Sequence, residues 1–266
     1  MSGNGPEIRE LTDPADLDKL TRVFDDVWRP DPANRPVSVD MLRALSHAGN
    51  YVAGAFVGDR LAGGSVAFFA APVGTTLHSH MTGVSRVGRG HNVGSALKMH
   101  QRGWALARGL TTITWTFDPL VARNAYFNIA KLGAAPIAYH RDFYGDLGDE
   151  LGGGDESDRL LMSWALDVPL PEPSDETVGD VVGAGGRMGI EMTGDVPKAI
   201  AEPGSPVVIP VPRDIEAMRR TDPVAASHWR TAVRDALAPH FASDTAAAAP
   251  ATRFLRSGHY VVATDE

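Results

Sequence analysis

The segment VSRVGRGHNVGSALKMHQR, residues 84–102, constrains the fold more than any other part of this sequence. It joins an apolar, strand-like run to an amphipathic helix through a glycine-rich turn that also contains Arg89 and Asn92. Such a turn leaves the first backbone N–H groups of the helix unpaired and directed at one point, where the helix dipole also favours negative charge. The segment therefore predicts a strand–turn–helix unit that binds an anion such as a pyrophosphate.

The distribution of charge supports a small anionic ligand. The 266 residues carry a formal net charge of −8, yet residues 84–108 contain no acidic residue. The basic residues of this stretch are Arg86, Arg89, Lys98, Arg102 and Arg108. An acidic chain is a poor nucleic-acid binder, because phosphate contacts require a basic face. The alternative is a plain structural turn with solvated arginines, and the glycine spacing matches neither the dinucleotide nor the P-loop motif.

Composition limits the remaining function classes. The chain has no cysteine, which excludes disulfides, thiolate metal ligands and cysteine nucleophiles. The amino-terminal sequence MSGNGPEIRE has no signal pattern, and the longest apolar run, AGGSVAFFAAPVG, is too short to span a bilayer. We expect a soluble, cytoplasmic protein with no membrane association and no bound metal.

Hydrophobic periodicity and turn residues predict an ordered series of elements up to about Asp167. The expected order is β-α-α-β-β-β-α-β-α-β-β. The segments are a strand at 8–11, helices within 12–28 and 38–49, a hairpin of 51–57 and 60–71, a strand at 75–84, a helix from 93 to about 108, a strand at 110–117, a helix within 122–133, and strands at 136–139 and 160–165.

The composition changes after residue 167. Residues 168–186 are rich in proline, glycine and acid, and we expect a linker there. Strand-like pieces at 187–192 and 206–211, helices at 213–220 and 225–241, a low-complexity loop SDTAAAAPA and a terminal hairpin around Ser257 and Gly258 follow. We therefore expect two domains, 1–167 and 168–266.

Residues Arg89, Gly90, His91, Asn92, Val93 and Gly94 resemble the acyl-CoA motif [QR]-x-x-G-x-[GA] of the GNAT superfamily of N-acyltransferases. Asn92 stands where glycine is usual in that motif. The order of strand, motif, helix, strand TITWTF and helix ending in KLGA also resembles the superfamily, over residues 6–166. The phrases LHSHMTGV, ALKMHQRGWALARG and ITWTFDPLVARNAYFNIAKLGA are similar to a predicted-acetyltransferase subgroup that carries a C-terminal extension.

The resemblance implies an α/β (α+β) fold with a mixed, mostly antiparallel central sheet flanked by helices, plus a smaller C-terminal α+β extension. It implies an N-acyltransferase that moves an acyl group, acetyl or succinyl, from acyl-CoA to a primary amine of a small molecule such as an amino acid. Acetyl-CoA or another short acyl-CoA would be the co-substrate. A homodimer is left open.

The resemblance also implies residues that hold the cofactor. Backbone groups around Thr82 and Val84 would hold the pantetheine, and Arg89 with the amides of residues 90–95 would hold the pyrophosphate. Those amides belong to Gly90, His91, Asn92, Val93, Gly94 and Ser95. Asn124 resembles the asparagine that contacts the cofactor arm, and its alternative role is to cap the helix NAYFNIAKLG.

Two histidines are candidates for the catalytic base. His78 lies eleven residues before Arg89, where histone-modifying members of the superfamily carry a glutamate base. Regular strand alternation would put His78, His80 and Thr82 on one face, and an imidazole titrates close to neutrality. The alternative is that these are partly buried structural histidines.

The catalytic acid is less clear from the sequence. The superfamily usually has a tyrosine four residues before the glycine of KLG, and here that position is Ile129. Tyr126, one turn earlier, is the first substitute, with packing as its alternative role; Tyr139 and Tyr144 are further candidates. The departure at Ile129 also motivates a second hypothesis, a catalytically inactive acyl-CoA sensor.

Two expectations concern the rest of the chain. Asp118 either forms the turn before Pro119, the interpretation that we favour, or presents a carboxylate near the substrate. Residues 168–266 are expected to pack on the transferase core and to help shape the acceptor site, and the alternatives are dimerisation or the covering of a sheet edge.

Overall fold

The computed structural model describes residues 5–30, 35–145, 155–200, 205–241 and 250–263. The chain forms two compact units. The first comprises Met1–Trp115, Gly148–Glu150 and Ala165–Asp167, and the second comprises Thr116–Leu147, Leu151–Trp164 and Val168–Glu266. Most of the low-complexity segment SDTAAAAPA lies outside the described residues. The division expected at residue 167 stays a prediction, since a shared family core and a compact unit are different criteria.

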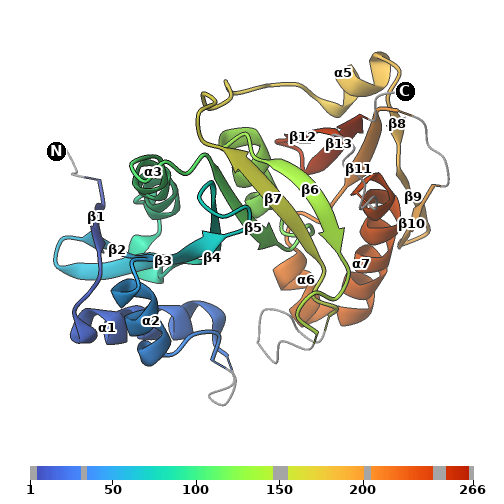
Figure 1. The fold of residues 1–266 in the computed structure, drawn as a ribbon. Coiled ribbons are helices and arrows are strands. Elements are labelled where there is room, and N and C mark those ends of the chain that lie inside the picture. Colours follow the sequence, from blue (N-terminus) through green and yellow to red (C-terminus); the bar gives the residue numbers. More distant parts are fainter. Residues whose placement is uncertain (1–4, 31–34, 146–154, 201–204, 242–249, 264–266) are drawn as a thin grey trace. The chain divides into compact units, whose positions relative to one another are not determined.

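The first unit is built on a mixed sheet with the strand order β1-β2-β3-β4-β5 (Figure 1). Strands β1 to β4 pair antiparallel, and β4 pairs parallel with β5. The elements are β1 Glu7–Glu10, α1 Pro14–Trp28, α2 Val39–His47, β2 Tyr51–Val57, β3 Arg60–Ala70, β4 Thr76–Val84, a 3-10 turn Arg86–Gly88, α3 Val93–Leu106 and β5 Thr112–Phe117. This order and this mostly antiparallel sheet confirm the expected fold class.

Helices cover both faces of this sheet, and in Figure 1 α1 and α2 lie on one side of it and α3 on the other. On the first face, the buried core joins helix residues to sheet residues: Leu17, Leu20, Phe24, Leu42, Val52, Val66 and Met81. On the other face, Val93 and Leu97 of α3 pack against Ala55 and Ala62. The apolar residues recur at helical spacing, so each helix buries one stripe.

Local signals fix the ends of these elements. Asp13 caps α1 by accepting a hydrogen bond from the Ala15 amide, and the Ser38 side chain caps α2. Gly58 has a φ of +59° in the turn between β2 and β3, a conformation that a side chain disfavours. The expected helices and hairpin of this unit are confirmed. Among the described residues, no helix is long and apolar enough to cross a membrane.

The second unit contains the rest of β5, the antiparallel pair β6–β7, a four-stranded sheet of order β12-β13-β11-β8 and a β9–β10 ribbon. Its elements are α4 Ala122–Ala125, a π-helical turn Tyr126–Lys131, β6 Ala135–His140, β7 Arg159–Ala165, α5 Val178–Gly183, β8 Arg187–Met188, β9 Ile190–Thr193, β10 Val196–Ala199, β11 Val207–Pro210, α6 Ile215–Thr221, α7 Pro223–Leu237, a 3-10 turn Ala238–Phe241, β12 Ala251–Leu255 and β13 His259–Ala263. The smaller α+β extension and its terminal hairpin are as expected.

Three details differ from the sequence-based expectation. The helix expected within 122–133 is α-helical only over Ala122–Ala125 and continues as a π-helix over Tyr126–Lys131. The expected linker 168–186 contains α5, which begins with a capping box between Thr177 and Asp180. Strand β10 was not expected, because its residues VPKA follow a turn and carry no alternating pattern.

Buried ion pairs fasten the extension to residues that follow β5. Asp118 accepts hydrogen bonds from Arg219 Nη2 (2.6 Å) and Arg230 Nη1 (2.9 Å), and both arginines also contact Asp155. Arg234 forms a further ion pair, in which its Nη2 lies 2.7 Å from Asp158 Oδ1. Burial by itself would raise the pKa of Asp118, but the charges and hydrogen bonds of Arg230 and Arg219 hold it well below its ordinary value. Helices α6 and α7 are therefore integral to the second unit.

Replacing Arg230 by alanine should lower the free energy of unfolding by about 3–5 kcal/mol, because it leaves two buried carboxylates short of a partner. The control is Arg253→Ala, which breaks the more exposed pair with Glu176 and should cost about 1 kcal/mol or less. Urea denaturation of each variant measures the difference. Because the folded-state pKa of Asp118 is depressed, its stabilisation is present above about pH 4 and is lost as the pH falls further. Equal losses in the two variants would contradict a structural role for the cluster.

Candidate functional site

Strands β4 and β5 pair over only a short distance. Their register joins Thr76 to Thr112, Leu77 to Ile113, and His78 to Thr114, and within the described residues it ends there. Strand β4 nevertheless continues along β3 to Val84. Its later backbone groups on the β5 side are thus released from the ladder and can bond another molecule.

A β-bulge interrupts β4 just beyond this point. Ala67 of β3 lies opposite Ser79, whereas the neighbouring Val66 lies opposite Met81. His80 is therefore the inserted residue of the bulge. A bulge re-aims the side chains that follow it, because the alternation of the strand shifts by one residue.

The bulge separates residues that regular alternation would place together. The rings of His78 and His80 lie 5.3 and 5.8 Å from the ring of Phe68 on β3, so both imidazoles share its face. The hydroxyl of Thr82 instead lies 2.8 Å from Ser65 Oγ, on the face that α3 covers. The expectation that Thr82 shares a face with the two histidines is wrong, and the inserted residue is the reason.

The two histidines differ in environment. His78 is half-buried, and its Nδ1 lies 3.0 Å from Thr114 Oγ1. Burial lowers the pKa of His78 to about 4, and the charges of His80 and Lys98 add to this effect. His80 is exposed at the bulge, and partial desolvation lowers its pKa as well. Both imidazoles are consequently neutral at physiological pH.

The glycine-rich turn leads directly into α3. Asn92 occupies the N-cap position with a φ of +55°, and its side chain makes no capping hydrogen bond. Asparagine tolerates this left-handed conformation, which explains how it replaces the glycine that is usual in the motif. The amides at the start of α3 therefore stay available to an anion, with the exposed Arg89 nearby in sequence.

No family model and no curated protein matches this sequence. Solved structures do match its fold. The Salmonella typhimurium protein yncA, described as an acetyltransferase and solved with its cofactor acetyl-CoA, matches with a TM-score of 0.50 at 17% identity, over 64% of this chain and 99% of that one. The chain has the GNAT acetyltransferase fold. About a third of it lies outside this match, as expected for a C-terminal extension.

Two further matches have lower TM-scores. The ribosomal-protein-S18-alanine N-acetyltransferase of Escherichia coli has a TM-score of 0.48 at 14% identity, over 62% of this chain and 96% of that one. Aminoglycoside 6'-acetyltransferase type Ii has a TM-score of 0.47 at 18% identity, over 62% and 99%.

The remaining residues expected from the GNAT resemblance belong to the second unit. The hydroxyl of Tyr126 accepts a hydrogen bond from Arg256 Nε (3.2 Å), which comes from the turn of the terminal hairpin. Asn124 is exposed and lies inside α4, where Val121 is the N-cap, so its alternative role as a cap is wrong. The Tyr139 hydroxyl donates its proton to Asp158 (2.6 Å). The Tyr144 hydroxyl lies 3.4 Å from the Thr116 hydroxyl.

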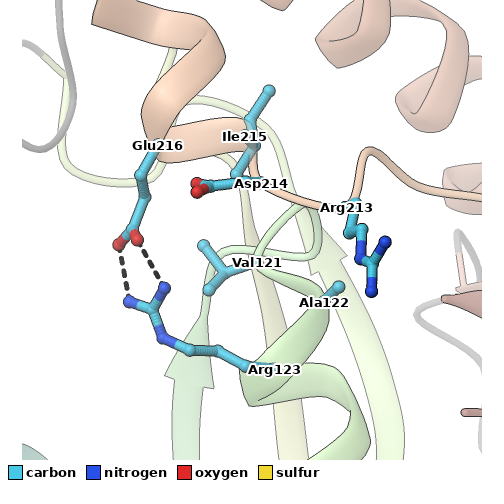
Figure 2. A pocket seen from close by; sticks show the side chains of 7 residues that line it. All are labelled: Val121, Ala122, Arg123, Arg213, Asp214, Ile215 and Glu216. Carbon is cyan, nitrogen blue, oxygen red and sulfur yellow. Dashed lines mark hydrogen bonds and ion pairs between the residues drawn. The ribbon is translucent and has the colours of Figure 1, made fainter.

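A small cavity of about 130 Å³ lies between the start of α4 and the residues around the start of α6 (Figure 2). Its walls are Val121, Ala122, Arg123, Arg213, Asp214, Ile215 and Glu216. Figure 2 shows Arg123 and Glu216 facing each other in a bidentate ion pair, whereas the guanidinium of Arg213 lies apart from them. All of these residues belong to the second unit.

The sequence analysis did not identify the buried polar side chains between α3 and strands β3 and β4. Ser65 Oγ accepts from Gln101 Nε2 (3.2 Å), and Gln101 Oε1 accepts from Lys98 Nζ (3.3 Å). A lysine and a glutamine three residues apart on a helix with an apolar stripe were the available signal. Asp118 was favoured as a turn former, and it does accept from the Leu120 amide (2.9 Å) besides binding its two arginines. Among the described residues, no cluster of three or more His, Asp or Glu could hold a metal ion.

Proposed function

We propose that this protein is an acyl-CoA-dependent N-acyltransferase that moves a short acyl group, acetyl in the first instance, to the primary amine of a small molecule. Two observations carry the proposal together: the pairing of β4 with β5 ends early, and the start of α3 has no side-chain cap. The pyrophosphate of CoA would lie at residues 89–95, and its pantetheine would bond the released backbone of β4 around Thr82 and Val84. The GNAT fold, which includes a protein solved with acetyl-CoA, supports this assignment.

Transfer of the acyl group requires a neutral amine, a polarised thioester carbonyl and a proton for the leaving thiolate. We assign removal of the ammonium proton to His80, directly or through water, because His80 is exposed at the bulge beyond the last β4–β5 pair. His78 is a weaker base, since a pKa of about 4 gives it little affinity for a proton at neutral pH. Its bond to Thr114 suits a neutral neighbour that holds the two strands together at this point.

Calorimetry with CoA and acetyl-CoA tests the cofactor site. Arg89→Ala should weaken binding several-fold, because it removes a cation beside the pyrophosphate. Gly94→Val should nearly abolish binding: a Cβ at Gly94 meets only Val84 Cγ2, at 3.8 Å, so the variant folds but its side chain fills the space that the ligand needs. Gly103→Val on the same helix is the matched control, because its Cβ meets nothing within 4 Å. A wild-type protein that ignores both ligands would refute the proposed function.

Steady-state kinetics tests the base. His80→Ala should lower kcat/KM by roughly 10²-fold while CoA affinity stays unchanged, and His78→Gln should have a smaller effect. Unchanged activity in His80→Ala, together with a large loss in His78→Gln, would reverse the two roles.

We propose that residues 168–266 help to bind the acceptor amine, and we test this at the cavity of Figure 2, whose lining residues all belong to the second unit. The exposed guanidinium of Arg213 would bind an anionic group of the acceptor, such as the carboxylate of an amino acid.

For the amine that gives the highest rate in a panel, Arg213→Ala should raise the acceptor KM about tenfold or more and leave the KM of acetyl-CoA unchanged. Arg220→Ala is the control. Arg220 lies on α6 and is exposed like Arg213, but it does not line the cavity. An acceptor KM that Arg213→Ala leaves unchanged would remove the cavity from the acceptor site.

A second candidate is an acyl-CoA sensor without catalysis, which the buried Ile129 at the usual tyrosine position favours. Acetyl-CoA-dependent thiol release over the same amine panel separates the two functions. Tight CoA binding with no thiol release on any amine would favour the sensor.

A further inference from the structure

Lys98 lies where the two strands part. It is only 6% exposed, and its Nζ donates to Ser79 Oγ at 2.9 Å and lies 4.1 Å from the centroid of the Trp115 ring. Ser79 and Trp115 are the residues that directly follow the last β4–β5 pair, His78 and Thr114. The ammonium of Lys98 therefore bridges the diverging strands on the face that α3 covers.

This cation is held by neutral groups. Its partners are the Ser79 hydroxyl, the Gln101 amide oxygen and the Trp115 ring, and no carboxylate pairs with it in the described part of the chain. Burying an ammonium without a counter-charge is costly, and burial lowers the pKa of Lys98 to about 7. The side chain can thus exchange a proton near neutral pH.

Strands β1 to β4 all contact α3, and their ionisable groups are as follows. On β4, His78 is close enough for the lysine charge to lower its pKa, and His80 follows it. Tyr51 of β2 is bonded to His100, and Glu10 of β1 accepts from the Trp104 indole. Strand β3 presents the uncharged Ser65 to α3. No anion among these described groups neutralises the ammonium by direct contact.

The proposed reaction leaves one proton donor unassigned. Ile129 occupies the usual position of the acid and has no proton to give. The Tyr139 hydroxyl donates its proton to Asp158, whereas the Tyr126 hydroxyl accepts from Arg256 and keeps its own proton, so Tyr126 is the alternative donor. The pantetheine would run along β4 from the start of α3, so its thioester would lie in the gap where β4 and β5 separate. The buried ammonium of Lys98 is beside that gap.

We propose that Lys98 is the general acid that protonates the departing CoA thiolate, an inference that rests on the proposed function. As the tetrahedral intermediate collapses, the C–S bond breaks and its electron pair stays on sulfur. A proton then moves from the Lys98 ammonium to that sulfur, which leaves a neutral lysine and the CoA thiol. The proton lost by the acceptor amine goes to the base and then to solvent, and solvent returns a proton to Lys98.

The test compares Lys98→Met, which keeps the length of the side chain without a charge, with Lys98→Arg. The arginine keeps the positive charge but does not give up its proton. Lys19→Met, an exposed lysine of α1, is the control for the substitution. Circular dichroism and calorimetry with desulfo-coenzyme A, which lacks the sulfur, establish that each variant folds and binds. Lys98→Met should lower kcat about 10²-fold with the KM of acetyl-CoA nearly unchanged, and Lys98→Arg should be similarly slow.

A spectroscopic measurement isolates the lysine–sulfur contact. The ultraviolet absorbance of the thiolate is followed against pH for bound coenzyme A, with bound desulfo-coenzyme A as the blank. In Lys98→Arg the thiol should ionise about 1 pH unit or more below its value in Lys98→Met, because a neighbouring permanent cation favours the thiolate.

The outcomes separate the two proposals. If the wild type binds neither acetyl-CoA nor desulfo-coenzyme A, the proposed function fails and this inference fails with it. If the wild type binds both, and the bound thiol ionises at the same pH with methionine as with arginine at position 98, only the role of Lys98 is overturned. The same holds if kcat is unchanged in a folded Lys98→Met.

Discussion

The backbone pairing between β4 and β5 ends at His78 and Thr114, and the acyl transfer that we propose depends on that stop. A strand released from its ladder exposes donors and acceptors that must find other partners. The side chains around the stop hold the two strands at this point: His78 contacts Thr114 on one face, and Lys98 joins Ser79 to Trp115 on the other. In the function that we propose, the backbone of β4 beyond this point binds the pantetheine of CoA.

The inserted residue at His80 adds a second constraint. Without the bulge, the imidazoles and the Thr82 hydroxyl would share one face of β4. With it, the imidazoles stay beside Phe68, while Thr82 joins a chain of polar side chains that runs through Ser65 and Gln101 to Lys98. In the mechanism that we propose, removal of a proton from the amine and delivery of a proton to sulfur would therefore take place on opposite faces of one strand.

Much of the fold could be predicted from the sequence, because it is encoded locally. Caps such as Ser38, the turn at Gly58 and the left-handed Asn92 are specified by the residues themselves. The bulge could not be predicted, because it depends on which residues of β3 lie opposite β4. The same holds for Asp118, whose local sequence indicates a turn and whose arginine partners lie 101 and 112 residues later. For the candidate site, the sequence thus indicated the glycine-rich motif but not the buried polar groups. The roles of its residues stay predictions.

The partners of Asp118 also bear on the synthesis of the protein. Domains generally fold as units, amino-terminal parts first, while the chain leaves the ribosome. Strand β5 and the turn after it emerge long before α7, so Asp118 has to wait for Arg230 as the last member of its buried cluster. Contacts between residues so distant in sequence form slowly. During translation, the carboxylates of Asp118 and Asp155 therefore lack their full set of arginine partners until α7 has been made.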